Sequence, residues 1–405
     1  MAKTDRSLTL SWWVYLNNDF PIGEYVARKT ETLLLIPLAV FLWPVSHLLL
    51  RAKVFVWPIF SERLGHQCLE SDCAIRYSRS QGKARKIILI SRHQRLANSS
   101  LFDILPPCTH HMEGRLVYAG SVALTYFNLY RKARSFCRVP TAYQTYREIL
   151  SSTSPAFVMS DRQRLAARRL FEELVLDSHL LQDMHEQTTY CVFNFRHPYQ
   201  GVAGDQLQAQ RCSSAAHLKT ALVYLRNAGI VPILTGSPPR EEIDSLPIDL
   251  YVNYPASKWK SDLNDLLLCG NAKFCLGSTS GLTLLSSIFG VPCVIHNQVP
   301  YKTYWYSDID LIIPKLMNDK TSGSLIAYSK EAVEATLRSR YIVDSPDVPY
   351  FYAECTHEDI LSTTMEMCIQ LKLIPGWTAS TPGGSCGSIS PTFRHKYDKY
   401  LPPSA

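Results

Sequence analysis

The sequence predicts an α/β protein made of two Rossmann-like domains, each with a doubly wound parallel sheet, which face each other across a cleft. Two observations lead to this fold class. The chain of 405 residues exceeds one ordinary domain, and its 46% hydrophobic content suffices for large cores. From residue 52 onward, short apolar runs alternate with helical patterns, which is typical of parallel β/α units.

The first predicted sheet contains three short apolar runs of strand length, at 53–60, 86–91 and 115–120. The segment 66–79 between the first two runs fits a helix. The amphipathic stretch 162–182 predicts a helix that connects this sheet to the next one.

The second predicted sheet has five strands at α/β spacing, at 189–196, 229–236, 248–254, 272–278 and 291–297. Helical patterns separate several of them, at 217–229, 261–270 and 282–290. The first of these helices ends on a glycine and the second opens on a capping serine. A last short helix is predicted within 390–401.

These elements divide the chain into four parts. They are an N-terminal segment at 1–51, an N-terminal Rossmann-like domain with its connector at 52–188, a C-terminal Rossmann-like domain at 189–375, and a tail at 376–405. The tail begins with GWTASTPGGSCGS, whose composition predicts a flexible segment.

An uncharged apolar run of 19 residues extends from Thr32 to Leu50. Its length is close to the lower limit of about 17 residues for a membrane span, and Pro37 and Pro44 interrupt it. Three interpretations stay open: a helix in the membrane interface, a single span, or a buried helix of the fold. Residues 51–95 carry ten Lys or Arg against three acids, which places the body of a membrane-associated protein in the cytoplasm.

The remaining composition argues against several classes of function. The net charge of +7 lacks an interleaved set of stacking aromatics, so nucleic acid is not an expected partner. The twelve cysteines include no C-x-x-C pair and no cysteine–histidine set with zinc spacing, which indicates reduced thiols in the cytosol and no metal site. The adjacent His110 and His111 lack a further ligand nearby and are interpreted as loop residues.

The stretch AKFCLGSTSG at 272–281 is a buried strand that runs into a turn of small and hydroxyl residues and then into a helix. Such a turn at the carboxyl edge of a parallel sheet suits phosphate, because the first N–H groups of the helix point at the anion. The residues that would contact it are Gly277, Ser278, Thr279, Ser280 and Gly281. The alternative is an ordinary helix N-cap.

Polar residues at the ends of other strands extend this candidate site. Arg196 follows the first strand of the second sheet and suits bidentate binding of phosphate. Arg211 lies in the same region and is equally compatible with a surface position. Tyr254 and Ser257 follow the third strand, where they would meet a base or ribose or else cap a helix.

The candidate base lies in the first domain. Gly65 and His66 follow the first strand, where the imidazole would face the cleft and remove a proton from an acceptor hydroxyl. A hydrogen-bonded histidine in a turn is the alternative. Glu62, Glu70 and Asp72 are rival bases by proximity, but we interpret them as solvated charges.

Together, RLGH, IPLAVFLWPVSHLLL, FNFR, Arg211, YPASKWKSD, FCLGSTSGL with FGVPCVIHN, and IPKL resemble a bacterial family of GT-B-type glycosyltransferases associated with surface-carbohydrate biosynthesis. The resemblance covers roughly residues 33–400 and is best in the C-terminal half. It implies an inverting, metal-independent enzyme in which Arg196 and residues 277–281 contact a diphosphate, with His66 as the base. His197 departs from the family pattern, which has an acid at this position.

The resemblance predicts transfer of a sugar from a nucleotide-diphosphate donor to a surface glycan or lipid-linked acceptor. The donor is a substrate, and no further cofactor is expected. The expected location is the cytoplasmic face of the inner membrane, for a peripheral or single-pass protein. Two alternatives remain: a nucleotide-sugar epimerase of the same fold, and a non-catalytic membrane-attached assembly partner.

Overall fold

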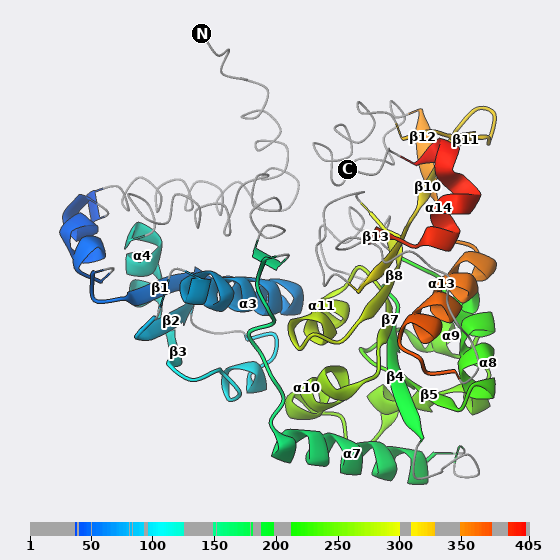
Figure 1. The fold of residues 1–405 in the computed structure, drawn as a ribbon, viewed down its shortest axis with the longest axis horizontal. Helices are drawn as coiled ribbons and strands as arrows, with labels where there is room; N and C mark the ends of the chain where they lie inside the picture. Colours follow the sequence, from blue (N-terminus) through cyan, green and yellow to red (C-terminus); the bar gives the residue numbers. More distant parts are fainter. Residues whose placement is uncertain are drawn as a thin grey trace.

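The computed structural model has an α/β fold with two parallel sheets, as the sequence predicts (Figure 1). It describes residues 37–38, 40–49, 51–80, 82, 84–92, 96–124, 149–150, 152–178, 180, 188–197, 212–299, 309–328, 349–374 and 388–401. We call residues 51–124 the N-terminal lobe and residues 188–401 the C-terminal lobe.

The N-terminal lobe contains a three-stranded parallel sheet in the order β1-β2-β3. Its elements are β1 (Val54–Ile59), α3 (Leu64–Ser80), β2 (Lys86–Ser91), η1 (Ser100–Phe102), β3 (Thr109–Glu113) and α4 (Arg115–Leu124). The predictions of the first two strands and of the helix between them are confirmed. Continuous apolar runs make β1 and β2 recognisable, because both of their faces are covered.

The predicted third strand at 115–120 is wrong, because this run forms the start of α4. A short apolar run does not distinguish a strand from a packed helix. The third strand is β3, which has the sequence THHME and includes His110 and His111. This polar strand lies at the edge of the sheet, so it lacks the apolar signature of a central strand.

The C-terminal lobe is built on a seven-stranded parallel sheet in the order β13-β9-β8-β7-β4-β5-β6. Its strands are β4 (Thr189–Asn194), β5 (Ile230–Leu234), β6 (Val252–Asn253), β7 (Cys275–Ser278), β8 (Cys293–Gln298), β9 (Leu311–Pro314) and β13 (Ser388–Ile389). Four of the five predicted strands are confirmed as β4, β5, β7 and β8. The fifth, predicted at 248–254, is a strand only at Val252–Asn253, and its first residues form a 3-10 helix. The prediction missed β9 and β13.

Helices cover both faces of this sheet (Figure 1). One face carries α7 (Asp161–Leu176), α10 (Asp262–Asn271) and α11 (Gly281–Ile288), and the other carries α8 (Lys219–Asn227) and α13 (His357–Gln370). The shorter segments are η5 (Ala215–Leu218), α9 (Arg240–Ile243), η6 (Ile248–Leu250), η7 (Tyr254–Ala256), α14 (Pro391–Tyr397) and η8 (Asp398–Tyr400).

A second, antiparallel sheet of three strands lies at the end of the C-terminal lobe. It contains β10 (Leu316–Asp319), β11 (Leu325–Ile326) and β12 (Tyr350–Ala353), with β10 in the centre. The sequence did not predict this sheet, and the predicted flexible stretch of the tail falls almost wholly outside the described residues.

The two lobes share one continuous apolar core. This core runs from β1 and α3 through α7 and α10 to α11 and β4. Polar contacts add to it, since Ser99 N–H donates to Asp262 Oδ2 (2.9 Å) and Asn98 Nδ2 donates to the Asp262 carbonyl (2.9 Å). The carboxyl edges of the two parallel sheets are thereby held against each other, which positions the candidate site.

The apolar run near the N-terminus is helical at residues 40–49, and residues 37–38 are also helical. Within the described part of the chain, no helix is both long enough and apolar enough to cross a membrane. The side chains of Phe41 and Leu48 are 77% and 63% exposed. These exposures do not agree with the interpretation of a buried helix.

Candidate functional site

The first turns of two helices meet where the parallel sheets end. α3 follows β1, and α11 follows β7. A Cβ atom on Gly281 would lie 2.8 Å from the backbone nitrogen of Gly65 and 2.9 Å from Cβ of Leu64. The two turns therefore touch through their backbones, and position 281 has no room for a side chain.

These two turns contain backbone N–H groups that no acceptor in the described structure satisfies. The earliest satisfied group in α3 is that of Gln67, and in α11 it is that of Thr283, which donates to Ser280 Oγ (3.2 Å). The backbone N–H groups that precede these two in the helices have no acceptor in the described structure, and their residues are at least partly exposed. They belong to Leu64, Gly65, His66, Gly281 and Leu282. Two positive helix ends thus converge with free donors, an arrangement that attracts anions.

His66 lies in the first turn of α3, and its side chain is 55% exposed. Its Nδ1 is 3.0 Å from Oε1 of Glu70, one helical turn later, and Phe60 packs edge-on against the imidazole at 5.2 Å. A carboxylate at Nδ1 accepts the N–H of the neutral ring, which leaves the lone pair on Nε2. Within the described residues this Nε2 has no partner.

Our interpretation of Glu70 as a solvated charge is wrong. The carboxylate is only 5% exposed, and its Oε2 accepts the backbone N–H of Phe60 at 2.6 Å. The two partners compensate for the cost of burying the charge. The spacing from His66 to Glu70 is i, i+4 on a helix, which is the sequence signal that could have identified the pair.

The hydroxyl groups of the turn after β7 are used inside the protein. Ser280 caps α11 and donates to Asn194 Oδ1 (2.7 Å), while Thr279 is fully buried and donates to Gln298 Oε1 (2.8 Å). The N-cap interpretation of Ser280 is therefore confirmed. An anion at this turn would meet backbone amides rather than these two hydroxyls.

Gly277 and Ser278 are also buried. A Cβ atom on Gly277 would lie 2.5 Å from Thr283 Oγ1 and 2.6 Å from Asn194 Nδ2, so this glycine serves the packing of α11 on the sheet. Ser278 Oγ has no hydrogen-bond partner in the described structure, and Ser278 pairs with His296 on the next strand. Contact of residues 277–281 with a diphosphate stays a prediction.

A second group of polar side chains lies at the carboxyl edge of β8 and β9, where two members are buried and two are partly exposed. We call His217, His296, Lys315 and Glu354 the His296 cluster. Glu354 lies 3.2 Å from His217 Nδ1 and 4.0 Å from Lys315 Nζ, and its Oε2 also accepts the N–H of Ser214 (3.0 Å). No local sequence pattern predicts this cluster, because its four members come from distant segments.

Burial decides the charge state of His296. The residue is fully buried, and desolvation together with the nearby Lys315 and His217 lowers the pKa of His296 to about 3. Its Nδ1 lies 3.3 Å from Asn297 Nδ2, while its Nε2 has no hydrogen-bond partner in the described structure. Desolvation also lowers the pKa of Lys315, and Glu354 opposes this effect. His296 is consequently neutral at physiological pH, with its proton on Nε2.

Arg196 lies two residues after the end of β4, close to this cluster. Its carbonyl accepts the N–H of Ser213 (3.0 Å), the residue before the serine that donates to Glu354. His197 Nδ1 lies 3.6 Å from Oε1 of Glu242 on α9. A carboxylate is thus present next to this position, but it comes from α9 and not from residue 197. Arg211 lies outside the described residues.

Tyr254 and Ser257 follow β6, at the edge of the sheet. Three strand spacings separate β6 from β7, or about 14 Å, so these residues do not lie beside the turn at 277–281. Tyr254 is fully buried, its hydroxyl lies 3.2 Å from the backbone N and O of Ser261, and Ser257 Oγ donates to the Tyr254 carbonyl (2.8 Å). Both residues thus have structural partners, and contact with a nucleotide stays a prediction.

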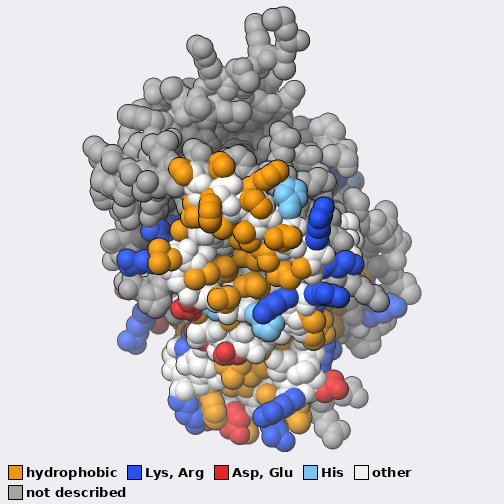
Figure 2. All heavy atoms as spheres, turned by 90° about the vertical axis from the view of Figure 1, so that its left-hand side faces the viewer, with side chains coloured by type: hydrophobic (Ala, Val, Ile, Leu, Met, Phe, Trp, Pro, Cys, Tyr) orange, Lys and Arg blue, Asp and Glu red, His pale blue; other side chains and the backbone are white. Residues whose placement is uncertain are grey.

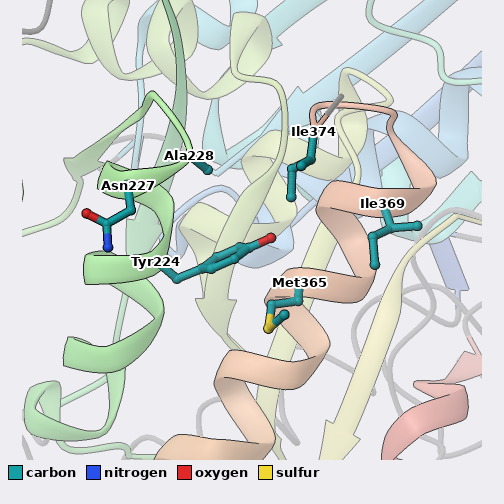
Figure 3. A pocket seen from close by; sticks show the side chains of 6 residues that line it. All are labelled: Tyr224, Asn227, Ala228, Met365, Ile369 and Ile374. Carbon is teal, nitrogen blue, oxygen red and sulfur yellow. The ribbon is translucent and has the colours of Figure 1, made fainter. Parts of the chain in front are cut away.

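An apolar hollow of about 280 Å³ lies between α8 and α13 (Figure 3). Its lining residues are Tyr224, Asn227, Ala228, Met365, Ile369 and Ile374. It contains no ionisable group suited to acid–base chemistry at neutral pH, and it lies on helices that cover one face of the large sheet. We therefore assign no part of the candidate site to it.

The described residues contain no group of three or more metal-ligating side chains. Neither a protein-family model nor a curated protein matches the sequence. The structure is similar to that of a glycosyl transferase family 9 protein from Veillonella parvula, with 10% identity, coverage of 78% of this chain and 97% of that one, and a TM-score of 0.47.

Two further similar structures are heptosyltransferases. ADP-heptose LPS heptosyltransferase II of E. coli is 10% identical, with 78% of this chain and 99% of that one covered and a TM-score of 0.43. The dodecameric iron-containing heptosyltransferase TibC of enterotoxigenic E. coli, in complex with ADP-D-β-D-heptose, is 11% identical, with 78% and 77% covered and a TM-score of 0.39. At this identity and these TM-scores, the likenesses assign neither a family nor an activity to this chain.

Proposed function

We propose that this protein is a glycosyltransferase, a hexosyl- or related transferase, that moves a sugar from a nucleotide-diphosphate donor to a hydroxyl of a surface glycan or lipid-linked acceptor. The supporting observation is the contact between Gly65 and Gly281. Through this contact, the pair of His66 and Glu70 lies beside the N-terminal end of α11, whose free amides attract anions. The proposed architecture is GT-B, with the reaction between the two lobes.

In this mechanism His66 is the general base. Its Nε2 accepts the proton of the acceptor hydroxyl while the oxygen attacks the anomeric carbon of the donor sugar. Glu70 is a positioning residue, because its carboxylate holds Nδ1 and favours the imidazolium that forms. A single displacement of this kind inverts the anomeric configuration.

The C-terminal lobe stabilises the leaving group. As the bond between the anomeric carbon and the diphosphate oxygen breaks, negative charge grows on the diphosphate. The unpaired amides of Gly281 and Leu282, the positive end of α11 and the guanidinium of Arg196 would stabilise this charge. With these groups the transfer requires no metal ion.

The substitution His66→Ala tests the proposal. We expect sugar transfer to fall about a thousandfold, because a general base contributes roughly 10²–10⁴-fold to the rate. Binding of the nucleoside diphosphate should stay within about twofold of the original protein, since the diphosphate meets α11 in this mechanism. Turnover is measured by mass spectrometry with a panel of nucleotide sugars and acceptors, and binding by calorimetry.

The matched control is His395→Ala, which removes an exposed histidine from α14 and should leave turnover unchanged. Full activity of the His66 variant would mean that the base lies elsewhere. Interconversion of the donor without an acceptor would favour the epimerase, and failure of every nucleoside diphosphate to bind would favour the assembly partner.

A further inference from the structure

The helix at residues 40–49 leaves its apolar side chains in solvent. Val40 is 60% exposed, Phe41 77%, Trp43 48% and Leu48 63%. A helix of a soluble domain normally buries such a stripe against its core. Only Ser46 is buried among the helix residues whose side chains the structure describes.

The first turn of α4 adds to this apolar surface. α4 packs on β1 and β2 and buries Ser121 and Ala123, while Leu116 is 88% exposed and Val117 is 41% exposed. Both helices lie at the left-hand end of Figure 1, and Figure 2 shows hydrophobic side chains gathered in one patch on that end. We call this surface the apolar face.

Positive charge borders the apolar face. Arg51 and Lys53 follow the helix directly, and the N–H groups of Arg85 and Lys86 both donate to the Lys53 carbonyl (3.0 and 3.4 Å). These four side chains are exposed and form no ion pair within the described structure. Figure 2 shows Lys and Arg side chains along both sides of the patch and few acidic ones near it.

We propose that the N-terminal lobe docks on an anionic phospholipid bilayer through the apolar face, as a peripheral protein. The apolar side chains enter the interface, Trp43 lies at the headgroup level, and the four cations bind the lipid phosphates. A protein partner would not require this unpaired cationic border, so charge complementarity favours the lipid. The docking is independent of the transfer reaction, and it would bring a lipid-linked acceptor to the lobe that carries His66.

Sedimentation of the full chain with vesicles tests the docking. The protein should bind vesicles of phosphatidylglycerol and phosphatidylcholine more strongly than vesicles of phosphatidylcholine alone. The double substitution Phe41→Asp with Leu116→Asp should lower the bound fraction about tenfold or more, because both side chains lose their apolar contact with lipid. Leu165→Asp on α7, where the side chain is 54% exposed, is the matched control and should bind as the original protein does.

A variant of the cationic border separates the electrostatic contribution to vesicle binding from the apolar contribution. Arg51→Gln together with Lys53→Gln, Arg85→Gln and Lys86→Gln should abolish the preference for anionic vesicles and most of the salt dependence, because the apolar contact alone remains. Vesicles whose lipids carry brominated acyl chains should quench the tryptophan fluorescence of the bound protein. Trp43→Phe should remove most of that quenching.

Three results would overturn the docking proposal. They are failure of the original protein to bind anionic vesicles, equal binding by the Phe41 and Leu116 variant, and a dimer in sedimentation velocity that this variant abolishes. Calorimetry of the same variant with nucleoside diphosphates distinguishes the two proposals. Retained nucleotide binding with lost vesicle binding leaves the transferase proposal intact.

Discussion

His66 and His296 both lie at the carboxyl edge of a parallel sheet, and the Nε2 atom of each has no hydrogen-bond partner within the described residues. Their surroundings are opposite. His66 is 55% exposed and has a carboxylate at Nδ1, whereas His296 is fully buried beside the ammonium group of Lys315. The two imidazoles therefore differ both in their access to solvent and in the charge of their nearest ionisable neighbour.

The difference indicates a division of roles between the lobes. The Glu70 carboxylate at Nδ1 fixes the tautomer of His66 that leaves the lone pair on Nε2. Burial and a nearby cation keep His296 neutral, so it can donate a hydrogen bond but cannot act as a base near pH 7. Under the proposed function, proton transfer is therefore assigned to His66 in the N-terminal lobe and not to His296 in the C-terminal lobe.

We expect the largest loss of stability and activity from Gly281→Val, because a side chain here would push apart the first turns of α3 and α11. The new side chain would clash with the backbone of Gly65, and a backbone atom cannot move aside as a flexible side chain can. We expect a loss of about 3 kcal/mol in the free energy of unfolding, typical of severe overpacking. Urea unfolding measures it, and turnover should be lost at concentrations where the variant remains folded.

Gly120→Ala is the matched control for that change. Gly120 lies inside α4, and no atom outside its own helix comes within 4 Å of a Cβ built there. This substitution should raise stability by about 0.5 kcal/mol or more, because alanine is the better helix former. A Gly281→Val protein that is as stable and active as the original would show that the contact between α3 and α11 is not needed.

The second largest effect is the pH dependence that His296 gives to the free energy of unfolding. The pKa of His296 is about 3 in the folded protein against an ordinary value of 6.5, so between these values only the unfolded chain takes up the proton. The free energy of unfolding should therefore fall as the pH drops below 6.5, by up to about 1.4 kcal/mol per pH unit from this residue.

The comparison with His296→Gln isolates this contribution. Between pH 6.5 and 4.5 the original protein should lose roughly 2 to 3 kcal/mol more than the variant, because all other groups titrate in both proteins. Urea unfolding at the two pH values provides the measurement. Equal losses in the two proteins would mean that His296 is accessible to protons in the folded state.

Much of the fold was predictable because most of its parallel strands lie in short apolar runs. β1, β2, β4, β5, β7 and β8 were found this way. β3 was missed because a polar edge strand has no such run, and α13 was missed because its buried residues include Thr363, Thr364 and Glu366. The hydroxyls of Thr363 and Thr364 donate to carbonyls one helical turn earlier, and Glu366 accepts from the distant Ser390, so these polar residues are buried although they interrupt the apolar pattern.

For the site, the sequence indicated where two turns lie but not how their side chains are used. Gly65, His66 and Gly281 could be placed because strand ends are recognisable. The partners of Thr279 and Ser280 are Gln298 and Asn194, which are remote in sequence, so the internal role of these hydroxyls could not be predicted. The same reason explains why the His296 cluster was missed.

The smallest effect is expected from Glu70→Gln, which changes the partner of His66 and leaves the imidazole in place. Gln can still accept the Phe60 N–H through its oxygen, but its amide nitrogen would then face Nδ1 as a donor. This favours the tautomer with the proton on Nε2, which cannot act as a base. We expect turnover to fall about 30-fold, less than for His66→Ala, with nucleotide binding unchanged.

A double variant shows whether Glu70 acts through His66. Glu70→Gln added to His66→Ala should lower turnover no further, because the carboxylate then has no imidazole to orient. Glu62→Gln is the control, because this exposed carboxylate lies in the loop between β1 and α3 and should not change turnover. Unchanged turnover in the Glu70 variant would mean that the pair only stabilises α3. The contrast between His66 and His296 would then arise from burial alone.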